Sequence, residues 1–252
     1  MRRRLIAGNW KMHMTVAETD SFIQTLRPRI AEDETLDVLI IPPFTSLDRA
    51  ARSLADSSIR LGAQDVHPEP RGAFTGAVSG EMLAACGCQY VLIGHSERRH
   101  VFGDSDEIVA RKLRAGLGSQ LQPILCVGET LEERRAGLTE SVLVRHLSTS
   151  LVGLSEHELR CIEIAYEPVW AIGTGETATP QQAQEATATI RAWVRCELGR
   201  AHAEHIRILY GGSVKPGNTA DLVTQADVDG ALVGGASLDP ESFLAIIDAA
   251  RG

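Results

Sequence analysis

Three side chains, Glu167, His95 and Lys11, are of the types needed to move a proton beside a carbonyl group. A carboxylate can serve as general base, an imidazole as electrophile and a lysine ammonium as a positive charge for the developing enediolate. Taken singly, each has an ordinary structural explanation: a strand end, a core histidine and a solvated charge. Together they favour proton abstraction, and because no HxH or HExxH motif is present, we expect stabilisation by His, Lys and amide dipoles without a metal.

Two glycine pairs occur near the C-terminus, in "YGGSV" (210–214) and "VGGAS" (233–237). A single pair indicates no more than a tight turn. Two pairs placed after neighbouring strands allow backbone N–H groups to point at one spot, which is how phosphate is bound in barrel enzymes. We therefore expect Ser213, Gly234 and Gly235 to form an anion site, with Lys11 supplying a mobile charge nearby.

The segment "AYEPVWAIGTG" (165–175) places Glu167 at the end of an apolar run, directly before an apolar loop with Gly173 and Gly175. An ordinary exposed loop explains the glycines but not Val169, Trp170 and Ile172. We interpret the loop as a lid, since closing it would expel water beside Glu167 and strengthen the carboxylate as a base.

Eight short apolar runs recur at intervals of about 30 residues, the size of one strand-helix unit. Each is continuous rather than alternating, which is typical of strands covered on both faces. The runs are "RLIAGNW" (4–10), "DVLIIPP" (37–43), "IRLGAQ" (59–64), "YVLIGHS" (90–96), "QPILCVGE" (122–129), "EIAYEP" (163–168), "IRILYGG" (206–212) and "GALVGGA" (230–236).

Segments with helical patterns lie between these runs, for example 15–30, 104–118 and 179–198, the last with Thr179 as cap and Pro180 at the first helical position. The alternation predicts a single α/β domain over residues 1–252, a parallel (β/α)8 barrel. A doubly wound open sheet is the alternative, but it would be expected to carry a glycine fingerprint after its first strand. In a barrel the polar residues Asn9, Lys11, His95 and Glu167 all follow strand ends, on the face where such folds place active sites.

Composition limits the classes of partner. The 252 residues carry 25 Lys and Arg against 33 Asp and Glu, a net charge of −8, which argues against nucleic acid or an anionic membrane. No run of about 18 apolar residues is present, so no membrane span is expected. The opening MRRR is followed by too few apolar residues for an export signal. Five cysteines without CxxC or CxxH spacing indicate free thiols in a reducing compartment, so we expect a cytoplasmic protein.

From Gln64 to about Gly80 the chain shows neither helical nor strand periodicity, and a loop of this length in a compact domain is usually functional. Its exposed-looking Phe74, beside Thr75, indicates a protein contact.

The whole chain resembles triosephosphate isomerase. The stretches that carry the resemblance are "AGNWKMH" (7–13), "GAFTG" (72–76), "VLIGHSERR" (91–99), "CVGETLEER" (126–134), "AYEPVWAIGTGETATP" (165–180), "YGGSVKPGN" (210–218) and "GALVGGASL" (230–238). The resemblance implies interconversion of dihydroxyacetone phosphate and glyceraldehyde 3-phosphate in glycolysis and gluconeogenesis, without cofactor or metal.

The resemblance also implies a role for each matching residue. Glu167 moves the proton between carbons, neutral His95 shifts protons between oxygens, and Lys11 and Asn9 stabilise charge. Phosphate is held by Gly173, Ser213, Gly234 and Gly235, while Glu97 and Cys126 support the site. Glu97 also has a simpler explanation, a structural ion pair. The long loop is similar to one that docks into an identical subunit, which places Phe74 and Thr75 in a homodimer interface.

The chain departs from the family pattern at His13, Ala77, Asp104 and Glu176, where asparagine, glutamate, glutamate and lysine are usual. Ala77 cannot pair with Arg98 across the interface, so Arg98 must find Asp104, Glu97 or water, and we expect a weakened dimer. Two other functions remain open. An aldolase or synthase would share the phosphate site, but a Schiff-base aldolase would want a lysine where Glu167 stands. A non-catalytic sugar-phosphate binder would not need Glu167, His95 and the lid together.

Overall fold

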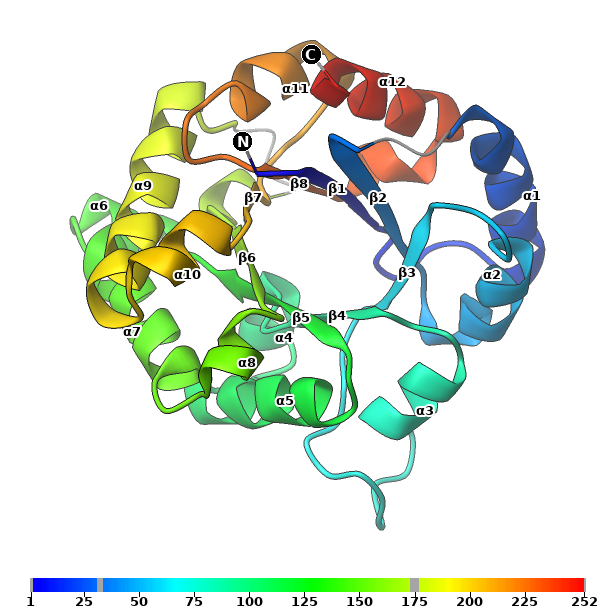
Figure 1. Cartoon of the computed structure of the whole chain (residues 1–252), viewed down its shortest axis with the longest axis horizontal. Helices are drawn as coiled ribbons and strands as arrows, with labels where there is room; N and C mark the ends of the chain where they lie inside the picture. The colour runs from blue at the N-terminus through cyan, green and yellow to red at the C-terminus, as the bar shows by residue number, and fades with distance from the viewer. Residues whose placement is uncertain (1, 31–33, 173–176, 252) are drawn as a thin grey trace.

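The computed structural model describes residues 2–30, 34–172 and 177–251. Eight parallel strands close into a barrel in chain order, with β1 pairing both β2 and β8 (Figure 1). The (β/α)8 prediction is confirmed. The strands are β1 Arg4–Asn9, β2 Leu36–Ile41, β3 Arg60–Ala63, β4 Tyr90–Ile93, β5 Gln122–Val127, β6 Glu163–Tyr166, β7 Ile208–Tyr210 and β8 Gly230–Val233.

The helices form a ring outside the strands (Figure 1). The α-helices are α1 Val16–Leu26, α2 Leu47–Ser53, α3 Gly80–Ala85, α4 Ser96–His100, α5 Asp106–Gly118, α6 Leu131–Arg135, α7 Thr139–Leu151, α8 Glu156–Leu159, α9 Pro180–Glu197, α10 Arg200–His205, α11 Pro216–Val223 and α12 Pro240–Arg251. The 3-10 turns among the described residues are η1 Arg27–Arg29, η2 Phe44–Ser46, η3 Val169–Ala171 and η4 Gly235–Leu238. None of the helices in this part of the chain is long and apolar enough to cross a bilayer.

Helix boundaries follow local chemistry. Thr179 caps α9 by accepting a hydrogen bond from the Gln182 N–H at 3.2 Å, with Pro180 at the first helical position, as predicted. The first helix is shorter than the predicted 15–30, because Pro28 cannot continue the α-helical hydrogen bonding and the chain tightens into η1.

The continuous apolar runs are explained by two separate cores. Alternate strand residues such as Leu5 and Ala7 fill the barrel interior, in a cluster with Leu39, Ile41 and Leu92. The residues between them face outward to the helices, for example Ile6 and Val38, which belong to the larger cluster. Because successive strand side chains point to opposite faces, both faces must be apolar.

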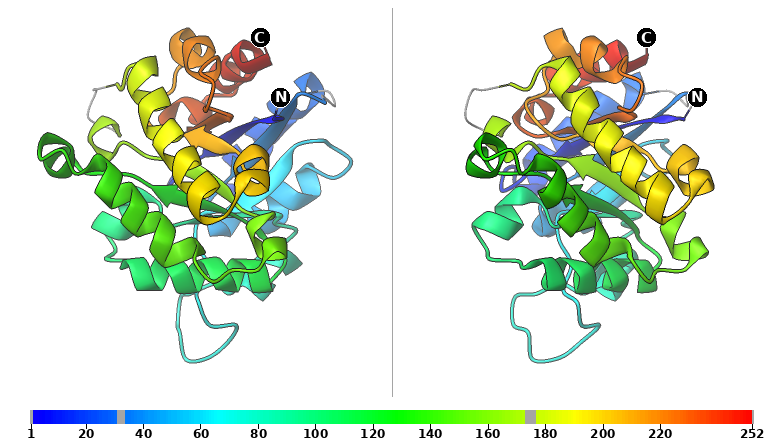
Figure 2. Two further views of the ribbon diagram at one scale, coloured as in Figure 1. Left: turned by 60° about the vertical axis from the view of Figure 1, so that its left-hand side comes forward. Right: turned by 90° about the vertical axis from the view of Figure 1, so that its left-hand side faces the viewer.

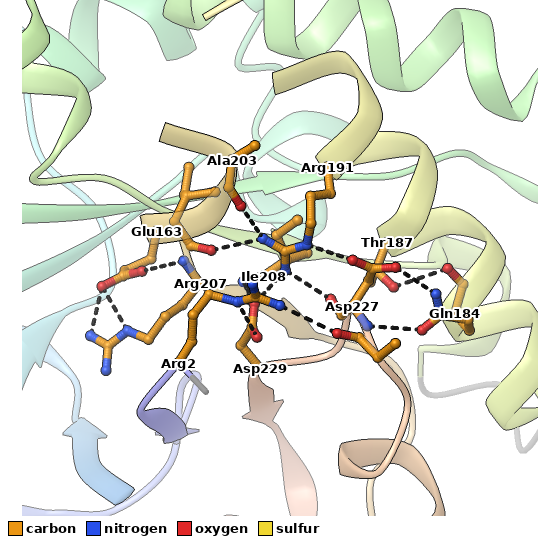
Figure 3. Close-up of polar contacts among 12 residues, drawn as sticks. Arg2, Glu163, Gln184, Thr187, Arg191, Ala203, Arg207, Ile208, Asp227 and Asp229 are labelled. Atoms are coloured by element: carbon orange, nitrogen blue, oxygen red, sulfur yellow. Dashed lines mark hydrogen bonds and ion pairs between the residues drawn. The ribbon is translucent and has the colours of Figure 1, made fainter. Parts of the chain in front are cut away.

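Buried ion pairs join the amino ends of β6, β7 and β8 to α9 (Figure 3). The Arg191 guanidinium lies 2.6 Å from Asp227 Oδ1 and 2.5 Å from Asp229 Oδ2, and Asp229 also accepts the Ile208 N–H. Arg207 lies 2.6 Å from Glu163 Oε1. Removing one partner from such a buried pair costs about 3–5 kcal/mol, so this end of the barrel serves stability.

The predicted long loop is present between β3 and α3. It projects beyond the ring of helices in all three views (Figures 1 and 2). One isolated bridge, between His67 and Ser79, ties its two arms together near the base.

Candidate active site

A cavity of about 370 Å³ opens at the carboxyl ends of the strands. It brings together seven of the residues predicted from sequence: Asn9, Lys11, His95, Glu167, Ser213, Gly234 and Gly235. They end or follow five different strands, β1, β4, β6, β7 and β8, so the parallel barrel gathers them on one face. Gly173, also predicted, lies outside the described residues, as do Gly175 and Glu176.

Glu167 is the first residue after β6 and is only 2% exposed. Its Oε2 accepts the backbone N–H of Ser96 at 2.8 Å. Its Oε1 lies 3.0 Å from Nε2 of His95 but out of line with it, and has no hydrogen-bond partner within the described part of the chain. A buried carboxylate oxygen without a hydrogen bond is energetically costly, which favours a functional explanation.

His95 stands at the amino end of the short helix α4 and acts as its cap. The backbone N–H of Glu97 donates to Nδ1 at 3.2 Å. An Nδ1 that accepts a hydrogen bond cannot carry a proton, so the ring is neutral with its single proton on Nε2. The Nε2–H group therefore faces the cavity as a donor.

Lys11 has a left-handed backbone, with φ 52°, that is unusual for a residue other than glycine. Two side chains hold this conformation: Asn9 Oδ1 accepts the Lys11 N–H at 3.0 Å, and Gln64 Nε2 donates to the Lys11 carbonyl at 2.7 Å. The Lys11 ammonium pairs with Glu97 Oε1 at 2.7 Å. Glu97 thus contacts both Lys11, through its side chain, and His95, through its backbone N–H. Its side chain forms the ion pair that the simpler explanation predicted.

The two glycines after β7 are required by close approach. A Cβ on Gly211 would lie 2.9 Å from Glu167 Cγ, and one on Gly212 would clash with the Tyr210 hydroxyl at 2.2 Å. A Cβ on Gly234 would lie 3.4 Å from Lys11 Cε, against the cation. The chain after β8 enters η4, so backbone N–H groups at its start are directed away from the turn, as an anion site needs.

The described part of the predicted lid is anchored by a residue that the sequence analysis did not single out. Glu129, fully buried after β5, accepts hydrogen bonds from Trp170 Nε1 at 3.0 Å, from the Tyr166 hydroxyl at 3.1 Å and from Arg134 at 3.1 Å. Its carbonyl also accepts the Val169 N–H at 3.1 Å. Beyond this anchor Ala171 and Ile172 line the cavity. Glu129 follows the end of β5 much as Glu167 follows the end of β6. A glutamate directly after an apolar run was therefore the sequence feature that could have identified Glu129.

Cys126 does not line the cavity. It is fully buried in the barrel interior, paired in register with Ala165 two residues before Glu167. Burial raises the pKa of its thiol well above the ordinary value, and the negative charge of Glu167 acts in the same direction. The thiol is therefore neutral and serves as packing beneath the carboxylate.

On the projecting loop, Phe74 is 44% exposed and its ring lies 4.1 Å from that of His67, centroid to centroid. Thr75 is exposed beside it. Both residues are far from the cavity within this chain. Other exposed apolar side chains come from the neighbouring carboxyl-end loops and from α3: Met12, Phe44, Met82, Val101 and Phe102.

Arg98 finds Asp104 within the chain, one of the partners expected in place of a glutamate at position 77. Its Nε lies 3.3 Å from Asp104 Oδ2, one of the predicted partners, and 3.3 Å from Asp65 Oδ2. Both carboxylates are shared with Lys112, whose Nζ lies 2.7 Å from Asp65 and 2.6 Å from Asp104. Two cations and two anions balance within the chain.

Comparison with known proteins gives one consistent answer. A family profile described as Triosephosphate isomerase matches residues 4–250. Triosephosphate isomerase of Symbiobacterium thermophilum is 51% identical over 250 residues, covering 99% of this chain and 98% of that protein. The enzyme of Roseiflexus sp. is 50% identical, with coverage of 98% and 97%, and that of Solibacter usitatus is 49% identical, with coverage of 98% and 100%. The chain belongs to the triosephosphate isomerase family.

Proposed function

We propose that this protein interconverts dihydroxyacetone phosphate and D-glyceraldehyde 3-phosphate through an enediolate, as a triose-phosphate isomerase. The observation that carries the proposal is the buried Glu167 carboxylate, with one oxygen unpartnered, beside the neutral His95 Nε2–H group. The relatives carry the isomerase name, and the aldolase alternative has Glu167 where its lysine would stand.

The substrate phosphate would bind at the amides of Ser213, Gly234 and Gly235. This placement directs the carbon chain of a triose towards the other end of the same cavity, where Glu167 and His95 lie. The resemblance adds the amide of Gly173, which lies outside the described residues.

The proton transfer follows from the two side chains. The free oxygen of Glu167 takes a proton from the carbon next to the carbonyl, leaving an enediolate whose charge falls on oxygen. The Nε2–H group of His95 donates its proton to that oxygen, and the same nitrogen takes a proton back from the neighbouring hydroxyl, which leaves the ring neutral and the negative charge on the other oxygen. The same carboxylic acid returns its proton to the neighbouring carbon.

Lys11 and Asn9 would stabilise the negative charge that develops during transfer. The Lys11 ammonium is fixed by its left-handed backbone and by Glu97, so little reorganisation is needed when the charge appears. Asn9 positions this backbone through the Lys11 N–H and also lines the cavity.

We also propose a homodimer formed through Phe74 and Thr75, a cytoplasmic location, and one domain over the 252 residues. The dimer is supported by the projecting loop and by the exposed apolar side chains around it. The location is supported by the free state of all five cysteines, Cys86, Cys88, Cys126, Cys161 and Cys196.

A coupled assay that supplies glyceraldehyde 3-phosphate and detects dihydroxyacetone phosphate tests the activity. Glu167→Gln should lower kcat by at least about 10²–10⁴-fold, because an amide cannot accept the carbon proton. Glu140→Gln, the same change at an exposed position on α7, is the matched control and should retain full activity. Turnover of Glu167→Gln within a few-fold of the wild type would remove Glu167 as the base.

A further inference from the structure

The catalytic cavity has a second lysine, Lys215, that the chemistry above does not use. It lines the cavity two residues after Ser213 and is exposed to solvent. The chain has only three lysines among its 25 basic residues, Lys11, Lys112 and Lys215. Lys112 is buried in ion pairs, so both accessible lysines face the catalytic cavity.

The backbone of Lys215 is held firmly while its side chain is not. Asn218 Oδ1 accepts the Lys215 N–H at 2.8 Å, and Asn218 Nδ2 donates to the Ser213 carbonyl at 3.1 Å. The Lys215 carbonyl accepts the Thr219 hydroxyl at 2.8 Å at the start of α11. One asparagine thus fixes Lys215 and Ser213 relative to each other, with Cα atoms at most about 7 Å apart.

The two lysines that line the cavity differ in whether a carboxylate neutralises their charge. Lys11 is paired with Glu97 at 2.7 Å, so its charge is largely offset before substrate arrives. No carboxylate of the described residues forms an ion pair with Lys215. Lys215 therefore balances the buried charge of Glu167, and without it the cavity and its bordering residues would carry a net negative charge.

A triose phosphate must approach this cavity as an anion, against a protein of net charge −8. A compact ammonium on a flexible four-carbon stem can meet a phosphate before it is seated and follow it inward. We propose that Lys215 is a capture residue for the proposed substrate: its ammonium draws the phosphate to the cavity mouth and takes no part in proton transfer.

The test compares Lys215→Gln and Lys215→Arg with the wild type over a range of ionic strength. For Lys215→Gln, kcat/KM should fall about five- to tenfold at an ionic strength of about 0.01 M and less than about twofold at about 1 M. The kcat should stay within about twofold, and Lys215→Arg should restore most of kcat/KM because it keeps the charge. The inhibition constant of inorganic phosphate should rise in parallel for Lys215→Gln.

Arg195→Gln is the matched control. It removes the same single charge from an exposed position in the last turn of α9, at the opposite end of the barrel from the cavity. It should leave kcat/KM unchanged at every salt concentration, and an equal loss there would show that net charge alone is responsible. A salt-independent loss, a fall in kcat or no effect of Lys215→Gln would overturn the proposal. Because it rests on the proposed isomerase activity, the wild-type assay separates the two: an inactive wild type would contradict the function itself.

Discussion

Glu167 has its two carboxylate oxygens in different environments. One accepts the Ser96 N–H, which stabilises the charge on a residue that is almost fully buried. The other faces His95 Nε2 without an aligned hydrogen bond. A fully satisfied carboxylate would be a weak base, and an unsatisfied one would be too costly to bury. The arrangement gives one oxygen a hydrogen-bond donor and leaves the other able to accept a proton.

Gly211 shows why a glycine next to the site is needed for packing as well as for turning. The sequence indicates a turn and an anion site at this glycine pair, but no packing contact. In the structure the backbone of Gly211 lies against the Glu167 side chain, and its N–H donates to the Tyr166 carbonyl at 2.7 Å. This contact joins residues from two strands and has no counterpart in local sequence.

Gly211→Ala should displace the Glu167 carboxylate. The new Cβ would lie 2.9 Å from Glu167 Cγ, closer than Cβ contacts allow, and at a tight 3.1 Å from the Tyr166 carbonyl oxygen. Since misplacing a catalytic group by about 1 Å can cost about 10²-fold, we expect kcat to fall at least about tenfold while the protein remains folded. Steady-state kinetics and circular dichroism measure the two effects.

Gly217→Ala provides the control for this substitution. Gly217 lies in α11, and a Cβ there meets nothing within 4 Å. Its activity should match that of the wild type. If Gly211→Ala is equally active, the contact with Glu167 does not position the base.

At the scale of elements, the strands were predictable because the barrel imposes one requirement on all of them. Each must be apolar on both faces, and all eight apolar runs became strands. The predicted runs extend beyond several strand ends. They include residues such as His95 and Glu167, where the chain leaves the sheet to present a side chain.

Contacts between neighbouring loops could not be predicted from the spacing of apolar residues along the chain. Gln64 follows β3 yet holds the Lys11 and Ile41 carbonyls, and Glu129 follows β5 yet anchors Trp170 after β6. Both residues act through partners distant in sequence. Only the closure of adjacent strands brings these loops together, so residues that line the cavity could be predicted from sequence, whereas the supporting contacts of Gln64 and Glu129 could not.

Helix α7 carries a buried histidine that should make stability depend on pH. His146 packs against Gly128 after β5, whose N–H points to its Nδ1 at 3.5 Å. Burial lowers the pKa of His146 to about 4, and the Arg99 charge acts in the same direction. The folded protein therefore keeps this ring neutral at pH values where the unfolded chain, with a pKa of about 6.5, binds a proton.

The sign follows from proton binding. Between about pH 6.5 and pH 4 the unfolded state holds one more proton at His146, so the free energy of unfolding falls as pH falls through this window. Between pH 7 and pH 5 this site should account for a loss of up to about 2 kcal/mol. Urea unfolding at fixed protein concentration should show a smaller loss for His146→Gln than for the wild type. The exposed His157→Gln is the control, and an unchanged pH dependence in His146→Gln would show that other groups cause it.

At the scale of the whole molecule, one surface combines the projecting loop with exposed apolar side chains. Phe74 packs against His67 at the loop, and Phe102 lies under the Arg98 guanidinium at 4.3 Å from the ring centroid. The loop base, α4 and α5 are joined beneath this surface through Asp65, Arg98, Asp104 and Lys112. The surface is therefore connected through ion pairs to α4, the helix that His95 caps, and in the proposed dimer this would link the subunit contact to the cavity.

The subunit contact is testable at Thr75 and Ala77. In the proposed dimer, Thr75→Arg would place a cation against a packed surface and should weaken association at least about tenfold, with activity falling as monomer accumulates. Thr224→Arg, at the end of α11 on the far side of the barrel from the loop, should remain dimeric and active (Figure 1).

Ala77→Glu should leave the dissociation constant of the dimer unchanged, because Arg98 is already engaged by Asp65 and Asp104 and would have to leave both. Sedimentation of dilute protein measures all three. A dimeric, active Thr75→Arg would exclude the loop as the interface, whereas a tighter Ala77→Glu dimer would mean that the Arg98 pairs within the chain yield to a partner's carboxylate.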